Sequence, residues 1–177
     1  MFRKLVFFGV GAVLLSGSAV AGEMQPAATA QFINPEGEGI GTATLWQGPH
    51  GVLIHVEIAG LSPGKHAIHL HAVGACEPDF GASGGHINPG GAKHGLLNPE
   101  GPDNGDLPNI YASETGDVQA ELYTTAVYVV EATPGAAPLF DEDGSALVVH
   151  AKGDDHVTQP IGGAGGRVGC GVIVPSA

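Results

Sequence analysis

Alternation of apolar and polar positions is clearest in residues 51–58 (GVLIHVEI), and residues 117–123 (DVQAELY) repeat it. A period of two is typical of a β-strand with one buried face. No segment carries the apolar stripe of an amphipathic helix. Further strands, separated by turns rich in glycine and proline, are predicted over 27–34, 40–47, 66–72, 126–131, 146–151 and 167–174. Eight short antiparallel strands predict an all-β sandwich or barrel.

Two glycine-rich stretches interrupt this pattern. Residues 73–109 are dense in Gly, Pro, Asn and Asp, and residues 152–166 separate the last two predicted strands. Loops of this length are uncommon in compact domains unless they are functional or disordered. The first loop contains Cys76 near its start and several His and Asp residues further along. We expect these side chains to hold it in place.

The N-terminus has the pattern of a secretory signal peptide. Two basic residues precede the apolar run 5–15, and the triplet Ala-Val-Ala that ends at Ala21 has the form of a cleavage site. The apolar run has 11 residues, whereas a membrane span needs about 20. The sequence therefore predicts a signal peptide over 1–21 and one mature domain over 22–177. That domain would be periplasmic or secreted, without a membrane anchor.

The net negative charge of the chain argues against two classes of binding partner, nucleic acids and anionic membranes. The 177-residue chain has 18 acidic and 6 basic side chains, and its formal charge of −12 becomes −14 once the signal peptide is removed. Such a chain lacks the basic patch that binding to nucleic acid or to an anionic membrane requires. Export also places the chain in an oxidising compartment, where Cys76 and Cys170 can pair.

Histidines concentrate the candidate chemistry. His69 and His71 stand two apart on the predicted strand 66–72, so both rings leave the same face, with Cα atoms about 6.6 Å apart. Such a pair can also be two stacked or solvent-facing histidines. The chain offers further ligands, however, on another strand and in the first loop: His86, His94, Asp103, Asp106 and His150. Imidazole-rich sites without thiolates suit copper(II) or zinc, so we predict a metal site.

Seven segments extend this interpretation, in chain order: HAIHLH (66–71), Cys76, GGHINP (84–89), KHG (93–95), GDLPN (105–109), LVVHAKGDD (147–155) and GGRVGCGVIV (165–174). Together they resemble the motifs of the exported bacterial copper–zinc superoxide dismutases. The resemblance implies an eight-stranded Greek-key β-barrel with two long functional loops. It also implies an antioxidant enzyme that converts superoxide to oxygen and hydrogen peroxide, with a copper ion and a zinc ion as cofactors.

The resemblance implies that four histidines bind copper: His69, His71, His86 and His150. His86 would also bind zinc through its other ring nitrogen, as a bridging imidazolate. Two further residues match zinc ligands, His94 and Asp106. Asp154 matches a carboxylate that links His69 to His94 and orients both rings.

Further roles follow from the same resemblance. Arg167 matches the arginine that guides and holds the superoxide anion, and His86 would supply a proton for peroxide formation. Cys76 and Cys170 match the disulfide that pins the long loop to the last strand. Bacterial relatives include monomers and homodimers, so both states stay open. An exported copper or zinc carrier is the second interpretation. The four copper histidines and Arg167 favour the enzyme, because a carrier needs no anion-guiding arginine.

One position departs from the family pattern. The family has a histidine three residues before the zinc-binding aspartate, whereas this chain has Asp103 three residues before Asp106. A carboxylate is a competent zinc ligand, so we predict a zinc site of His86, His94, Asp103 and Asp106. Two alternatives stay open: Asp103 is only a loop acid and zinc is weakly bound or absent, or His156 takes the place of the missing histidine.

Overall fold

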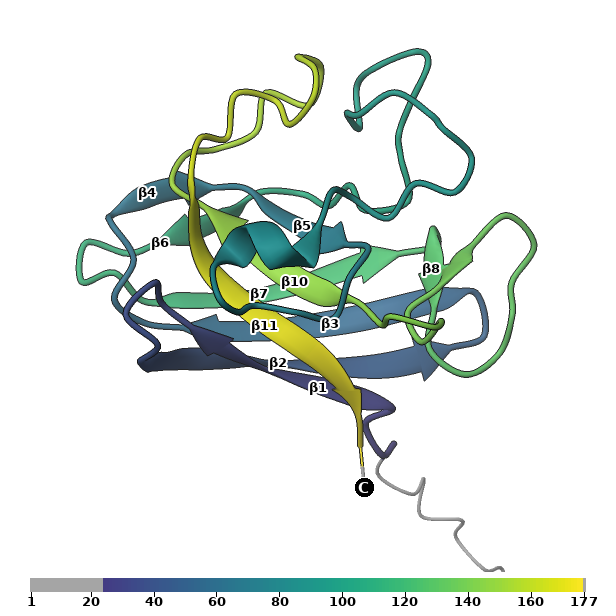
Figure 1. Ribbon diagram of the computed structural model, residues 1–177, viewed down its shortest axis with the longest axis horizontal. Helices are drawn as coiled ribbons and strands as arrows, with labels where there is room; N and C mark the ends of the chain where they lie inside the picture. Colours follow the sequence, from purple (N-terminus) through teal and green to yellow (C-terminus); the bar gives the residue numbers. More distant parts are fainter. Residues whose placement is uncertain (1–23, 177) are drawn as a thin grey trace, which may run out of the picture.

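The computed structural model describes residues 24–176, so the predicted signal peptide lies outside the described residues. Within this range no helix is both long enough and apolar enough to cross a membrane. The elements shown in Figure 1 are β1 (Ala28–Ile33), β2 (Gly39–Gly48), β3 (Gly51–Ile58), β4 (Gly64–His66), β5 (Ile68–His71), a 3₁₀ helix (Phe80–Ser83), β6 (Ile110–Ala112), β7 (Val118–Thr124), β8 (Val127–Tyr128), β9 (Ala137–Pro138), β10 (Ala146–His150) and β11 (Arg167–Pro175).

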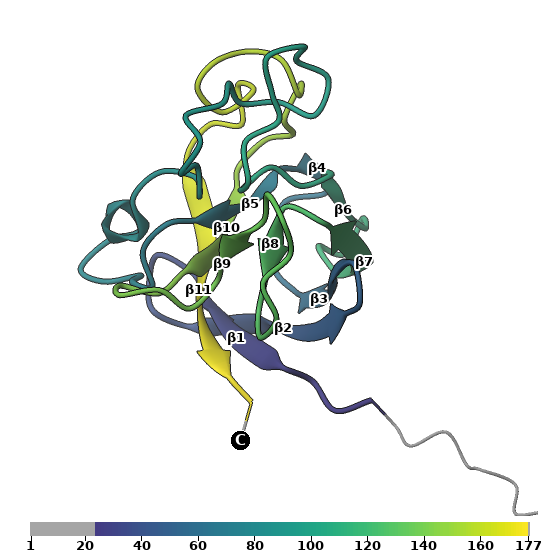
Figure 2. The same cartoon turned by 90° about the vertical axis from the view of Figure 1, so that its right-hand side faces the viewer.

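Seven strands form one antiparallel sheet in the order β5-β10-β11-β1-β2-β3-β7. The sheet curls around a central core, as Figure 2 shows. β3 and β7 are neighbours although three strands lie between them in sequence, so the chain crosses between the two ends of the sheet. Two short pairs, β4–β6 and β8–β9, complete the structure. The predicted all-β barrel is confirmed.

The strands differ from the prediction in three places. The predicted strand 66–72 divides into β4 and β5, because the N–H of Ala67 donates to the carbonyl of Lys152 in the second loop (2.8 Å). The short strands β6 and β9 were not predicted. β8 and β9 pair in parallel, so the prediction that all strands are antiparallel is wrong for this pair. The alternating segment 51–58 is β3 with the predicted bounds.

Apolar side chains fill the inside of the barrel, and a smaller cluster covers part of its outer face. The largest fully buried apolar side chains are Phe32, Leu45, Ile54, Ile68, Leu70, Leu107, Ile110, Leu139 and Leu147. The outer cluster surrounds the disulfide between Cys76 and Cys170, whose Cα atoms lie 5.8 Å apart. This disulfide, predicted from the resemblance, is confirmed. Because β10 lies between the two clusters, its first four residues, 146–149, are buried.

Both long loops rise from the same end of the barrel (Figures 1 and 2). The N–H of Leu70 on β5 donates to the carbonyl of Gly105 in the first loop (2.9 Å). A Cβ on Gly105 would lie 2.3 Å from the Leu70 carbonyl oxygen, so the close approach requires glycine. Two isolated bridges fasten the loop to the same edge of β5: His71 to His86, and His69 to Asp106.

Candidate metal centre

Strands β5 and β10 position three of the histidines on the outer face of the barrel. Ile68 and Leu70 belong to the main core, so strand alternation turns His69 and His71 the other way. Both histidines are nevertheless buried, because the first loop covers them. β10 pairs with β5, and a register shift at its end precedes His150, which is also buried.

Four imidazoles lie close together here, and we call them the first group: His69, His71, His86 and His150. The ring centroid of His69 lies 4.2 Å from that of His86 and 5.0 Å from that of His150. The centroid of His71 lies 5.3 Å from that of His86 and 6.0 Å from that of His150. Each ring has one buried nitrogen without a hydrogen-bond partner in the part of the chain that the structure describes: Nδ1 of His69 and Nε2 of His71, His86 and His150. Buried polar atoms are normally paired, so these nitrogens fit a metal ion.

The second ring nitrogen of three of these histidines is fixed by an oxygen. The acceptors are Asp154 Oδ2 for His69 (2.9 Å), the Gly84 carbonyl for His71 (2.9 Å) and the Gly165 carbonyl for His150 (3.1 Å). A proton on that nitrogen leaves a lone pair on the other. Burial, followed by the positive charges of His86 and Arg167, lowers the pKa of His71 to about 2. Burial likewise lowers the pKa of His150 to about 4, so both rings are neutral at neutral pH, which is the form that can bind a metal.

A second group adjoins the first and shares His86. The ligand atoms of His86, His94, Asp103 and Asp106 all lie within 4.8 Å of one another. His94 Nδ1 is 2.5 Å from Asp106 Oδ1 as an ion-pair contact, and neither buried atom has a hydrogen-bond partner within residues 24–176. Both atoms therefore remain available to a shared ion, as do the facing atoms of His86 and Asp103. Two imidazoles and two carboxylates suit zinc.

The second group favours a positive charge at its centre. Burial opposes the charged form of His86, but two carboxylates outweigh it and raise the pKa of His86 to about 9. Asp103 accepts a hydrogen bond from His86 Nδ1 (3.0 Å), and Asp106 Oδ1 lies 3.5 Å from the same nitrogen. Burial also opposes the charge of Asp106. The nearby ring of His86 (3.5 Å) and a hydrogen bond from the N–H of Gly95 (2.7 Å) nevertheless keep the pKa of Asp106 below its usual range. The proton on His86 thus occupies a position where a cation would be stabilised by two carboxylates.

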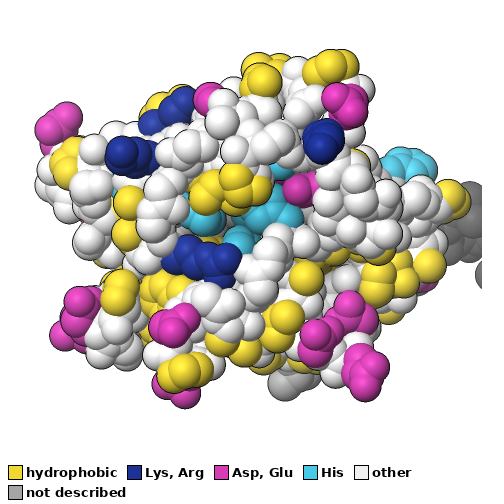
Figure 3. Space-filling view, turned by 45° about the horizontal axis from the view of Figure 1, so that its top comes forward, with side chains coloured by type: hydrophobic (Ala, Val, Ile, Leu, Met, Phe, Trp, Pro, Cys, Tyr) yellow, Lys and Arg dark blue, Asp and Glu magenta, His cyan; other side chains and the backbone are white. Residues whose placement is uncertain are grey.

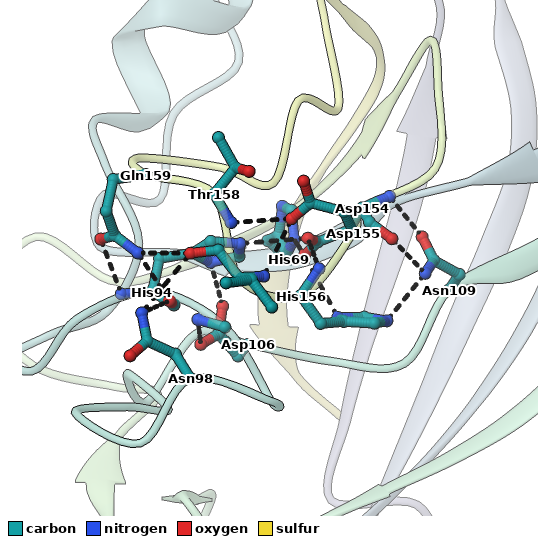
Figure 4. A network of polar contacts seen from close by, with 12 residues as sticks. His69, His94, Asn98, Asp106, Asn109, Asp154, Asp155, His156, Thr158 and Gln159 are labelled. Atoms are coloured by element: carbon teal, nitrogen blue, oxygen red, sulfur yellow. Dashed lines mark hydrogen bonds and ion pairs between the residues drawn. The ribbon is translucent and has the colours of Figure 1, made fainter.

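Asp154 links the two groups, because its carboxylate accepts a hydrogen bond from one ring of each (Figure 4). Its Oδ2 accepts from His69 Nε2 (2.9 Å), and its Oδ1 accepts from His94 Nε2 (3.1 Å) and from the N–H of His156 (2.6 Å). Burial opposes its charge, but these hydrogen bonds lower the pKa of Asp154 well below its usual range. Gly162 allows this packing, because a Cβ there would lie 1.6 Å from Asp154 Oδ1. The carboxylate therefore orients one ring of each group.

Arg167 begins β11 and lies beside the first group. Its Nη2 donates to the carbonyl of Gly84 (2.6 Å), and its Nη1 donates to Ser83 Oγ (2.9 Å) and to the Phe80 carbonyl. The Gly84 carbonyl also accepts from His71 Nδ1, so the guanidinium and that ring share one acceptor. Figure 3 shows histidine side chains at the base of a hollow with a basic side chain at its edge.

His156 lies outside both groups. Its Nε2 is 2.8 Å from Asn109 Nδ2, and its Nδ1 is 3.4 Å from Asp154 Oδ2. The alternative that His156 replaces the missing zinc histidine is therefore not supported, whereas Asp103 does lie within the second group. Sequence reasoning missed the residues that hold the ligands in place: Ser83, Gly84, Asn109 and Gln159. Gly84 and Asn109 stand in two of the quoted motifs, but their contacts are made with residues far away in sequence, so the motifs did not reveal these roles.

The fold and the two groups are those of one class of protein: β-barrels with two adjoining groups of candidate metal ligands that share one imidazole. The profile of one family, described as copper/zinc superoxide dismutase (SODC), matches residues 40–173. The chain therefore belongs to the copper/zinc superoxide dismutase family.

Individual relatives agree. The chain is 49% identical over 148 residues to a Cu-Zn superoxide dismutase of Caulobacter vibrioides, covering 82% of this chain and 84% of the relative. It is 42% identical to Cu-Zn superoxide dismutase 2 of Aquifex aeolicus, over 97% of this chain and 99% of the relative. Among solved structures, Cu/Zn superoxide dismutase from Brucella abortus matches with a TM-score of 0.66 and 29% identity, covering 82% of this chain and 98% of that one.

Proposed function

We propose that this chain disproportionates superoxide to oxygen and hydrogen peroxide. The observation that carries the proposal is the convergence of four buried, unpaired imidazole nitrogens beside a group of two imidazoles and two carboxylates. In this assignment the unpaired nitrogens hold copper: Nδ1 of His69 and Nε2 of His71, His86 and His150. His86 belongs to both groups, so its two ring nitrogens would serve one ion each.

Zinc would be held by the second group. Its ligand atoms are Nδ1 of His86, Nδ1 of His94, Oδ2 of Asp103 and Oδ1 of Asp106. Asp103 Oδ1 is already occupied, because it accepts from the N–H of Gly105 (2.9 Å). Its Oδ2, 3.0 Å from His86 Nδ1, is the oxygen that faces the centre of the group. A site with two carboxylates is more anionic than the three-histidine pattern of the family.

The protein residues divide the work of the reaction. A bound copper ion supplies the one-electron oxidation of one superoxide and the one-electron reduction of the next. Arg167 provides a fixed positive charge beside the first group, and this charge attracts and orients the superoxide anion. His86 Nε2 can take up a proton whenever its lone pair is free. Asp154 and the backbone carbonyls keep the other rings in position, so little reorganisation is needed between half-reactions.

Metal analysis combined with a dismutation assay tests the proposal. We expect the purified mature chain to bind one copper and one zinc ion and to remove superoxide well above the rate of free copper. The variant His150→Ala should lose copper but keep zinc, because His150 lies only in the first group. Copper bound without activity would instead support a carrier, and the proposed enzyme would be wrong.

Arg167→Ala is expected to lower the rate constant for superoxide several-fold and to flatten its dependence on salt. The guanidinium attracts the anion over a distance that salt screens beyond about 8 Å at physiological ionic strength. Pulse radiolysis at several salt concentrations measures both effects. Lys93→Ala removes the same charge from the first loop and serves as the control. An unchanged rate and salt slope in Arg167→Ala would exclude the arginine from the mechanism.

Export completes the proposal. The Cys76–Cys170 disulfide and the bacterial relatives support a location outside the reducing cytoplasm. We infer that the apolar N-terminal segment directs the chain to the periplasm or the exterior and is cleaved after Ala21. Mass spectrometry of the protein recovered from the periplasmic fraction should find a chain that begins at Gly22.

A further inference from the structure

The backbone of His94 is held by an amide side chain from the other loop. Its N–H donates to Gln159 Oε1 (3.1 Å), and its carbonyl accepts from Gln159 Nε2 (2.8 Å). One side chain thus pairs with both backbone groups of one residue, as a neighbouring strand would. The two residues are 65 positions apart in sequence. His94 lies in the first long loop and Gln159 in the second, so the pair of bonds joins the two loops (Figure 4).

A second side-chain amide, in the first loop, holds the backbone of a residue in the second loop. Asn109, at the end of the first loop, accepts from the N–H of Asp154 (2.7 Å) and donates to its carbonyl (3.0 Å). Asp154 belongs to the second loop. Each loop therefore supplies one amide that holds a site residue of the other. The two held residues also touch, because His94 Nε2 donates to Asp154 Oδ1 (3.1 Å).

Gln159 matters because the backbone of His94 has few other partners. His94 is buried (3% exposed) and lies outside every strand, and among residues 24–176 its N–H bonds only to Gln159. Its carbonyl also accepts from Asn98 Nδ2 (3.1 Å). A buried N–H without an acceptor is unfavourable, so loss of Gln159 would shift the backbone of His94. A shift of this backbone would move the attached ring, whose Nδ1 faces Asp106 in the second group.

We infer that Gln159 is a positioning residue of the zinc site. It fixes the main chain of His94, so that Nδ1 faces Asp103 and Asp106 before the ion arrives. This inference rests on the proposed assignment of zinc to the second group. Partners one step removed from a metal typically change its affinity by about 10- to 100-fold when they are lost, and we expect Gln159 to lie in this range.

The test measures the release of each metal from the loaded full mature chain. Gln159→Ala and wild type are titrated with a chromogenic zinc chelator, and copper release is followed separately with a copper chelator. We expect the zinc dissociation constant of Gln159→Ala to rise about 10- to 100-fold while the copper constant stays close to wild type. In the loaded protein, the amide hydrogen of His94 should exchange faster. Gln119→Ala is the matched control, because Gln119 is an exposed amide on β7 whose side chain donates to Glu57 Oε1 (3.2 Å), far from both groups in sequence.

Gln159→Met separates hydrogen bonding from packing. Methionine has a similar length but cannot pair with the backbone of His94, so we expect the same loss of zinc as in the alanine variant. Wild-type zinc affinity in Gln159→Met would overturn the inference, as would equal weakening of copper and zinc, which indicates general loosening. If wild type itself binds no zinc, the assignment under Proposed function is wrong. If wild type binds zinc and Gln159→Ala binds it equally well, only the role of Gln159 is wrong.

Discussion

Replacing both cysteines, Cys76→Ala with Cys170→Ala, is expected to lower the free energy of unfolding by about 3–5 kcal/mol. The two residues are 94 positions apart, and closing a loop of this size is worth up to about 4.7 kcal/mol in the chain-entropy model. Alanine is preferred to serine because Cys170 is fully buried, and a buried hydroxyl without a partner would add its own cost. The outer apolar cluster around the disulfide would also lose its sulfur contacts.

Urea unfolding of the metal-loaded and metal-free forms measures this change. The single variant Cys76→Ala, studied under reducing conditions, is the control, since it lacks the cross-link but keeps one native side chain. We also expect slower metal uptake in the double variant, because the disulfide ties the segment before His86 to β11, which carries Arg167. A change below about 1 kcal/mol, within the ordinary range of single substitutions, would show that the cross-link is not a main source of stability.

Asp103→Asn is expected to weaken zinc binding by about 100-fold or more. Loss of a partner one step removed from a metal typically costs 10- to 100-fold, and Asp103 is proposed as a direct ligand. Asparagine keeps the shape of the side chain and an acceptor for the N–H of Gly105. It loses the charge, and its amide group offers zinc a poorer oxygen or an NH₂. Chelator competition measures the loss, and copper content should change little.

Two further variants make this experiment specific. Asp103→His installs the residue that the family has at this position, and we expect it to retain zinc. Asp143→Asn removes one negative charge from an exposed turn and should leave zinc affinity unchanged. Zinc affinity equal to wild type in Asp103→Asn would mean that Asp103 is only a loop acid. The zinc site would then consist of His86, His94 and Asp106.

The sequence predicted strands well where one face is buried and the other is not. β3 agrees with the predicted bounds because its alternation extends over the whole strand. β6 and β9 have three and two residues, too few to show any period. β5 shows the limit of pattern reasoning, since its break from β4 depends on a hydrogen bond between Ala67 and Lys152, 85 positions away.

The candidate ligands could be predicted from the sequence, but the residues that hold them in place could not. The spacing of His69 and His71 placed both rings on one face, and the structure brings the other predicted ligands to them. The family resemblance, not the spacing, indicated which loop residues would join. Gln159 and Asn109 could not be recognised, because an amide in a glycine-rich loop looks like an ordinary solvated residue. Their roles come from contacts across 65 and 45 positions of sequence.

The bridges between the first loop and β5 also have a consequence for solubility. β5 is an edge strand of the seven-stranded sheet. An uncovered edge strand can pair with a strand of another molecule and so start aggregation. The loop covers this strand at His69 and His71, two of the proposed copper ligands. Assembly of the metal groups and protection against intermolecular strand pairing therefore depend on the same backbone contacts.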